Sequence, residues 1–151
     1  MKIVTLTFKI SIPANPATLF TYLTEWENFT DWILFTRVAI LSQTAQQVGT
    51  KLQSVTTIGP LSSIDGLVVT ECVAAERIIL EHTTRKYFNK GVFTIKQTSD
   101  ATCLLIWQEI TPVPFGYIGR AVLVIICPFL GIFYYASLHR LKKNIVSLNK
   151  K

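Results

Sequence analysis

The chain has 151 residues, a length that suits one domain with a substantial core. Half of the residues are hydrophobic and 16% are charged, compared with roughly 25% in average soluble proteins. The net charge of +6 lies in the last 37 residues, which carry six basic residues and no acidic one; residues 1–114 carry nine of each sign. A basic segment beside an apolar one favours membrane lipid over nucleic acid as an anionic partner, and a solvated helix tail is the alternative.

The sequence indicates a reduced, cytoplasmic protein, with or without peripheral contact at a membrane. Cys72, Cys103 and Cys127 each lie in an apolar run, their number is odd, and no CxxC motif is present. The opening MKIVTLTFKISI alternates between apolar and polar residues, whereas the hydrophobic region of a secretory signal would be continuous.

The first elements are predicted to be a strand and two short helices. Residues 2–12 alternate with a period of two, as expected for a half-buried strand that ends at Pro13. Asn15 is a suitable N-cap, and Pro16 occupies the first helical position. Residues 25–32 are expected to form a second short helix or turn, with aromatic residues at a spacing of three.

The middle of the chain is predicted to form six further strands and an antiparallel sheet. They are expected near residues 34–43, 50–57, 66–75, 77–85, 90–98 and 102–111. The turn signals between them include Gly59-Pro60, Asp65-Gly66 and Ser99-Asp100. The short connections favour hairpins between neighbouring strands. A long helix should follow from about residue 115 to residue 148 and cover the apolar face of the sheet.

The segment AVLVIICPFLGIFYYASL at 121–138 is uncharged and raises the alternative of a membrane span. We expect a helix gripped by the sheet instead, because a span would leave the apolar sheet face in water, at a cost of roughly 10 kcal/mol. Residues 121–136 are apolar around the whole helix, so a second subunit, a membrane surface or the mobile opening of a pocket should meet the outer face. Pro128 is expected to kink or break the helix.

The run ISIPANPATLFTYLTEWENFTDW resembles the opening of the START-like superfamily, also called the polyketide cyclase, Bet v 1-like or SRPBCC helix-grip proteins. The QVGT turn, the VTECVAAERIILEHTT strand pair, ATCLLIWQEI and HRLKKNIVSL are similar to later parts of that family. The resemblance covers nearly the whole chain and implies one α+β domain over 1–151. It also implies a hydrophobic pocket under the last helix, in a family of lipid carriers, cyclases and chaperone cofactors.

The candidate chemistry is sparse. No metal-ligand spacing, phosphate-binding loop or GxSxG motif is present, so no metal, cofactor or catalytic set is predicted. Cys103, Leu105, Trp107 and Glu109 share one face of a strand, and which face points inward stays open. If this face is inward, Glu109 should have a raised pKa and could orient a ligand hydroxyl or act as a general acid. Glu109 at the sheet rim is the alternative.

We therefore predict a cavity for a hydrophobic or amphipathic small molecule, lipid-like or polyketide-like, in a carrier or sensor. The alternatives are a cyclase or aromatase acting in the same cavity and a membrane-associated interaction protein that docks through its basic, apolar last helix. A peripheral membrane contact or a homodimer would use residues 121–136. Arg77 and Arg120 could each meet a ligand carboxylate or phosphate. The predicted ligand-binding residues are Trp32, His82, Phe93, Ile95, Leu105, Trp107, Glu109, Tyr117, Phe129 and Phe133.

Overall fold

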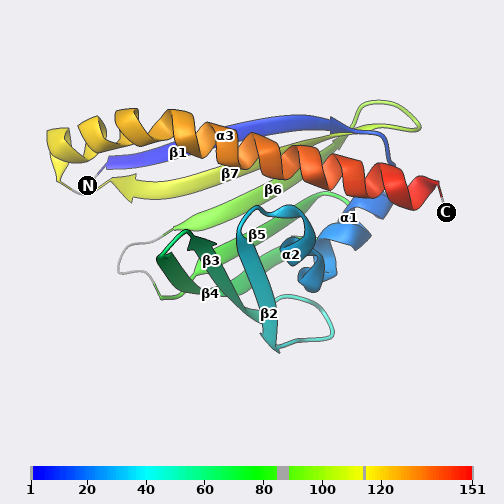
Figure 1. The fold of residues 1–151 in the computed structure, drawn as a ribbon. Helices are drawn as coiled ribbons and strands as arrows, with labels where there is room; N and C mark the ends of the chain where they lie inside the picture. Colours follow the sequence, from blue (N-terminus) through cyan, green and yellow to red (C-terminus); the bar gives the residue numbers. More distant parts are fainter. Residues whose placement is uncertain (1, 85–88, 114, 151) are drawn as a thin grey trace.

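A seven-stranded antiparallel sheet forms the body of the protein in a computed structural model, which describes residues 2–84, 89–113 and 115–150 (Figure 1). The strands are β1 (Lys2–Ile12), β2 (Thr36–Ser42), β3 (Lys51–Ile58), β4 (Leu61–Val73), β5 (Arg77–His82), β6 (Lys90–Gln97) and β7 (Cys103–Val113). Their order across the sheet is β1-β7-β6-β5-β4-β3-β2. The predicted α+β fold is confirmed, with a curved sheet, short helices after β1 and one long C-terminal helix.

The segment between β1 and β2 forms the short helices α1 (Pro16–Thr24), η1 (Trp26–Asn28) and α2 (Phe29–Trp32). Asn15 caps α1, because its side-chain oxygen accepts a hydrogen bond of 2.8 Å from the backbone N–H of Thr18. The aromatic residues of the predicted three-residue spacing, Trp26, Phe29 and Trp32, are all at most 1% exposed. They anchor the short helices in the core.

The hairpin of β3 and β4 differs from the prediction at one turn signal. Gly59 and Pro60 form the turn, as expected, since Ile58 pairs directly with Leu61. Asp65-Gly66 was predicted to be a turn signal between two strands, and this is wrong because both residues lie inside β4. Tertiary contacts outweigh the local turn preference there: the backbone N–H of Gly66 donates to Thr84 Oγ1, at 3.1 Å.

The helix α3 (Gly116–Asn149) grips the sheet through its second half. Its buried residues are Ser137, Leu138, Leu141 and Ile145. The ring of Tyr134 stacks on Phe8 of β1 at a centroid distance of 4.5 Å. Ser137 Oγ accepts a hydrogen bond of 3.1 Å from the backbone N–H of Leu34. Figure 1 shows α3 running beside β1 and β7 at one edge of the sheet.

The first half of α3 is exposed, which corrects the expectation that the whole apolar segment covers the sheet. By length and composition α3 could cross a membrane: its most apolar 18-residue window has a mean hydropathy of 2.2, and 11% of that window is buried. Of the kink or break predicted at Pro128, a break does not occur, because the helix continues through this residue. Pro128 is exposed, so water can hydrate the carbonyl that loses its hydrogen bond.

Candidate ligand pocket

A cavity of about 420 Å³ lies between the sheet, α2 and the middle of α3. Strands β2 to β7 contribute side chains from their inward faces, and α3 contributes Phe129, Leu130, Phe133 and Tyr134. The volume falls within the range of small-molecule sites, which is roughly 300–1,000 Å³. The cavity has an aromatic wall and a polar wall.

The aromatic wall is a continuous cluster that extends into the core. Phe93 stacks on Trp107 with ring centroids 5.2 Å apart, and Tyr134 meets Trp107 edge-to-face at 4.6 Å. Phe29 lies 6.0 Å from Phe93, and Phe133 contacts Tyr134 at 5.3 Å. Because each ring is held by its neighbours, this wall offers a preformed flat surface to an apolar ring or chain.

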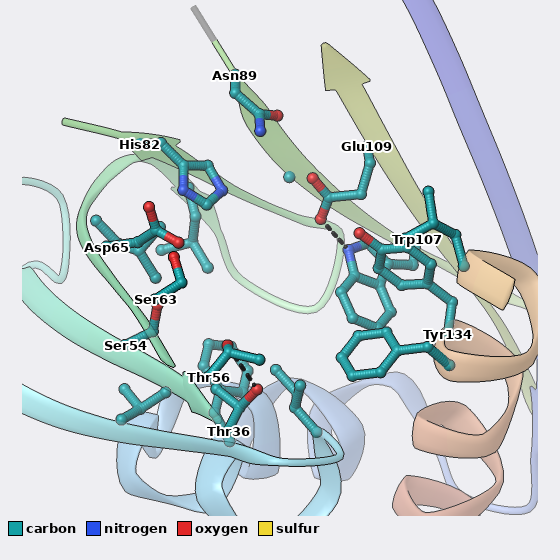
Figure 2. Close-up of a pocket in the computed structure, with 18 of the residues that line it drawn as sticks. Thr36, Ser54, Thr56, Ser63, Asp65, His82, Asn89, Trp107, Glu109 and Tyr134 are labelled. Atoms are coloured by element: carbon teal, nitrogen blue, oxygen red, sulfur yellow. Dashed lines mark hydrogen bonds between the residues drawn. The ribbon is translucent and has the colours of Figure 1, made fainter. Parts of the chain in front are cut away.

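Most of the polar wall comes from β2 to β5, opposite the aromatic wall, and Glu109 joins it from β7, the strand that also carries Trp107. Its labelled side chains in Figure 2 are Thr36, Ser54, Thr56, Ser63, Asp65, His82, Asn89 and Glu109. The hydroxyls of Thr36 and Thr56 are 3.0 Å apart and share a hydrogen bond. Alternation along β3 places Ser54 and Thr56 inward, and alternation along β4 does the same for Ser63 and Asp65.

Glu109 lines the pocket and is half-buried. Its Oε1 accepts a hydrogen bond of 2.8 Å from the indole N–H of Trp107, two residues earlier on the same face of β7. Gly91 pairs with Glu109 across the β6–β7 ladder. A Cβ at Gly91 would lie 3.1 Å from Glu109 Oε1 and 3.7 Å from Trp107 Nε1, so the glycine leaves the space that this pair occupies.

The polar wall is rich in acceptors. Among the described lining residues the side chains with a formal charge are the carboxylates of Asp65 and Glu109, and the imidazole of His82 is titratable. Asn89 is 6% exposed, and its buried Oδ1 has no hydrogen-bond partner within the described part of the chain. A ligand that donates hydrogen bonds would satisfy such a group.

The two arginines considered as partners for an anionic ligand lie elsewhere, so that expectation is not supported. Arg77 is exposed and pairs with Glu71 at 3.6 Å, outside the pocket. Arg120 is exposed on the first half of α3. In the described ranges, no group of three or more His, Cys, Asp or Glu side chains could hold a metal ion.

Six of the ten predicted site residues line the cavity: His82, Phe93, Trp107, Glu109, Phe129 and Phe133. The other four do not. Trp32 lies behind Trp107, with ring centroids 5.4 Å apart, and Ile95 and Leu105 are buried deeper in the core. Tyr117 is 89% exposed, because α3 begins well before it reaches the cavity.

Sequence reasoning missed most of the polar wall. Ser54, Thr56, Ser63, Asp65 and Asn89 were not among the predicted residues. A signal existed in β3, where Leu52, Ser54, Thr56 and Ile58 share one face with an apolar residue at each end. Alternation places these residues on a common face but does not reveal that a cavity lies in front of them.

No protein-family model matches the sequence, and no curated protein has significant sequence similarity to it. Solved structures do match. A START superfamily protein from Mycobacterium smegmatis superposes with a TM-score of 0.76 at 14% identity, covering 95% of this chain and 98% of that one. The Zhui aromatase/cyclase from a Streptomyces species gives a TM-score of 0.76 at 10% identity, covering 95% and 94%.

A third structure is a norcoclaurine synthase mutant from Thalictrum flavum in complex with a transition-state analogue. Its TM-score is 0.73 at 10% identity, covering 98% of this chain and 97% of that one. These likenesses, over nearly the whole of each chain, confirm the resemblance in fold. The chain therefore has the helix-grip fold of the START-like, or SRPBCC, superfamily.

Proposed function

We propose that the protein binds a hydrophobic or amphipathic small molecule in this cavity, as a carrier or sensor. The observation that carries the proposal is the pairing of a preformed aromatic wall with a wall of convergent polar groups around about 420 Å³. Most small-molecule sites combine apolar lining with a few placed polar groups. Proteins of the same fold include an aromatase/cyclase and an enzyme solved with a transition-state analogue, which supports a ligand-binding role.

The polar side chains of the lining favour a ligand that carries a hydrogen-bonding group, such as a hydroxyl or an amine. The carboxylate oxygens of Asp65 and Glu109 can accept hydrogen bonds from such a group, and the amide of Asn89 can donate or accept one. The ligand's apolar ring or chain would lie against Phe93 and Trp107, and its hydroxyl or amine would point toward Glu109 and Asn89.

A cyclase or aromatase type of enzyme is the second candidate. The observation that favours it is the presence of Asp65, His82 and Glu109 in one cavity, since paired carboxyls and an imidazole can move protons during a ring closure. Such an enzyme should lose most of its turnover of a polyketide-like substrate in Glu109→Gln and His82→Ala. Unchanged turnover in both variants would refute this candidate.

The binding proposal is tested by blocking the cavity. Ser63 faces the cavity, whereas its neighbour Ser62 faces away and hydrogen-bonds with Thr57 on the outside of the hairpin, at 3.1 Å. Ser63→Phe should abolish uptake of an apolar fluorescent probe, and Ser62→Phe should leave it unchanged. Equal uptake by both variants, or no uptake by the wild type, would contradict binding in this cavity.

A further inference from the structure

The first half of α3, residues 116–132, presents a large apolar surface to solvent. Five of its apolar side chains are each 69–73% exposed: Ile118, Val124, Ile125, Phe129 and Ile132. No charged residue occurs between positions 121 and 138. Soluble monomers rarely leave so much contiguous apolar surface uncovered, so this surface should have a partner.

The width of this surface distinguishes between partners. Val124 and Ile126 are both exposed, and residues two positions apart on an α-helix are separated by roughly 200° around its axis. Ile125 lies between them and is also exposed. A helix that packs on one neighbouring helix needs an apolar stripe only about 100° wide, flanked by polar residues. A helix from a second copy of the chain would therefore leave part of this apolar surface in water. The acyl chains of a bilayer would cover all of it.

The hairpin of β3 and β4 presents further exposed apolar side chains beside the cavity. Ile58 and Leu61 pair at the tip of the hairpin and are 55% and 75% exposed. Ile58 lines the cavity together with Phe129 and Phe133 of α3. The hairpin is uncharged from residue 52 to residue 64. Ile58 of the hairpin and Phe129 of α3 thus both line the cavity while remaining largely exposed.

Basic residues flank this surface on α3. Arg120 lies near the start of the helix, and Arg140, Lys142 and Lys143 follow the apolar segment. The last 37 residues contain no acidic residue. Exposed Lys and Arg beside an apolar surface attract the anionic headgroups of a lipid bilayer.

We propose that residues 116–132 of α3 and the tip of the β3–β4 hairpin, residues 58–61, dock on an anionic lipid bilayer. The helix lies in the plane of the interface, and the cavity opening faces the acyl chains. An apolar ligand then passes between the bilayer and the cavity without crossing water. This last consequence rests on the proposed ligand binding, whereas the docking itself does not.

The packing of α3 argues for docking in the plane and against a span. Tyr134 stacks on Phe8, and Ser137 bonds to the loop before β2, so the helix is fixed to the sheet from about residue 134 onward. The exposed part before it is about 17 residues, or roughly 26 Å at 1.5 Å per residue, which is shorter than the usual span of about 20 residues.

The test is flotation of the full chain, purified without detergent, with phosphatidylcholine vesicles and with vesicles containing about 30% phosphatidylglycerol. We expect the wild type to float with the anionic vesicles, more weakly with the neutral ones, and to be released by alkaline carbonate. The double variant Ile118→Glu, Ile125→Glu should bind the anionic vesicles roughly tenfold or more weakly. Leu41→Glu is the matched control, because Leu41 is 61% exposed on β2 at the far edge of the sheet, and it should bind like the wild type.

Three results would overturn the proposal: no flotation of the wild type, an equal loss in Leu41→Glu, or retention in the membrane after carbonate treatment, which would indicate a span. A stable dimer that the double variant dissociates, with no vesicle binding, would assign the surface to a second copy. Neither Ile118 nor Ile125 lines the cavity, so the double variant should still take up an apolar probe in solution. Failure of docking and failure of ligand binding are thereby distinguished.

Discussion

The indole N–H of Trp107 donates a 2.8 Å hydrogen bond to Oε1 of Glu109, two residues further along β7. The bond holds the carboxylate over the aromatic wall, and Gly91 on the neighbouring strand leaves the space for both side chains. The indole nitrogen of the aromatic wall is thus joined to one of the two carboxylates of the polar wall. A ligand that lies on Trp107 would meet Glu109 at its polar end.

Replacing Glu109 by Gln removes the negative charge of the side chain while keeping its size and shape. Gln can still accept the Trp107 hydrogen bond, so the fold should be unaffected. Affinity for an alkylammonium probe should fall roughly fivefold, because hydrogen bonds to charged groups contribute about 1 kcal/mol more than neutral ones. The change is measured by fluorescence titration against an alkylcarboxylate probe of equal chain length. Glu71→Gln, outside the pocket, is the control, and an equal effect of both substitutions would contradict the role of Glu109.

Replacing Gly91 by Ala should disturb the Trp107–Glu109 pair. The new methyl group would lie 3.1 Å from Glu109 Oε1, closer than ordinary van der Waals contact. We expect a loss of about 1–3 kcal/mol in the free energy of unfolding and a change in tryptophan fluorescence. Gly131→Ala in α3 is the control: a Cβ there meets nothing within 4 Å, and alanine favours helix by up to about 1 kcal/mol. A Gly91→Ala variant as stable as the wild type would show that the pair has room to move.

The strands and short helices were predictable because their signals are local. Asn15 and Pro16 start α1 through backbone hydrogen bonding and a fixed φ angle, and the alternation in residues 2–12 is preserved in β1. The inward face of β7 was not predictable, because both of its faces carry apolar residues and only packing against α3 selects Trp107 and Glu109. Asp65-Gly66 failed for the same reason, since contacts with residues 83 and 84 are distant in sequence.

Truncation of Leu138 tests which half of α3 stabilises the fold. Leu138 is fully buried, so Leu138→Ala should cost about 2–5 kcal/mol in the free energy of unfolding. Ile125→Ala is the control in the exposed half of the same helix, since Ile125 is 69% exposed, and should change the free energy of unfolding by no more than about 0.5 kcal/mol. Urea denaturation measures both. Similar costs for the two variants would contradict the division of α3 into an exposed half and a packed half.

Alkaline pH should destabilise the protein through Cys103 and Tyr22. Burial raises the pKa of the Cys103 thiol above its ordinary value of 9.0. Burial likewise raises the pKa of Tyr22 above 10.0, against the lowering effect of its hydrogen bond with Asn144. Above pH 9 the unfolded chain therefore releases protons that the folded chain retains, and the free energy of unfolding falls as the pH rises.

Urea denaturation between pH 8 and pH 11 measures this dependence. Cys103→Ala should show a shallower fall in the free energy of unfolding with pH than the wild type. The control Ser62→Ala, on the outside of the β3–β4 hairpin, removes no titratable group and should keep the wild-type slope. Stability that is constant or rises across this range would contradict the prediction.

The position of the cavity along α3 was the part of the site that sequence could least define. Tyr117 and Phe129 are both aromatic residues of the same apolar helix, and no pattern in the sequence separates them. The structure does so, because Tyr134 contacts Phe8 and Trp107 and so fixes which turns of the helix lie beside the cavity. Phe129 lies in one of these turns, whereas Tyr117 lies about three turns earlier and is exposed to solvent.

Native mass spectrometry of the protein, purified without detergent, tests ligand binding most directly. Our account predicts a population that carries an apolar or amphipathic adduct, present in Ser62→Phe and lost in Ser63→Phe. The mass of the adduct would identify the class of ligand. A protein that carries no adduct and takes up none of a panel of apolar amines and alcohols would contradict the assignment of this cavity as a binding site.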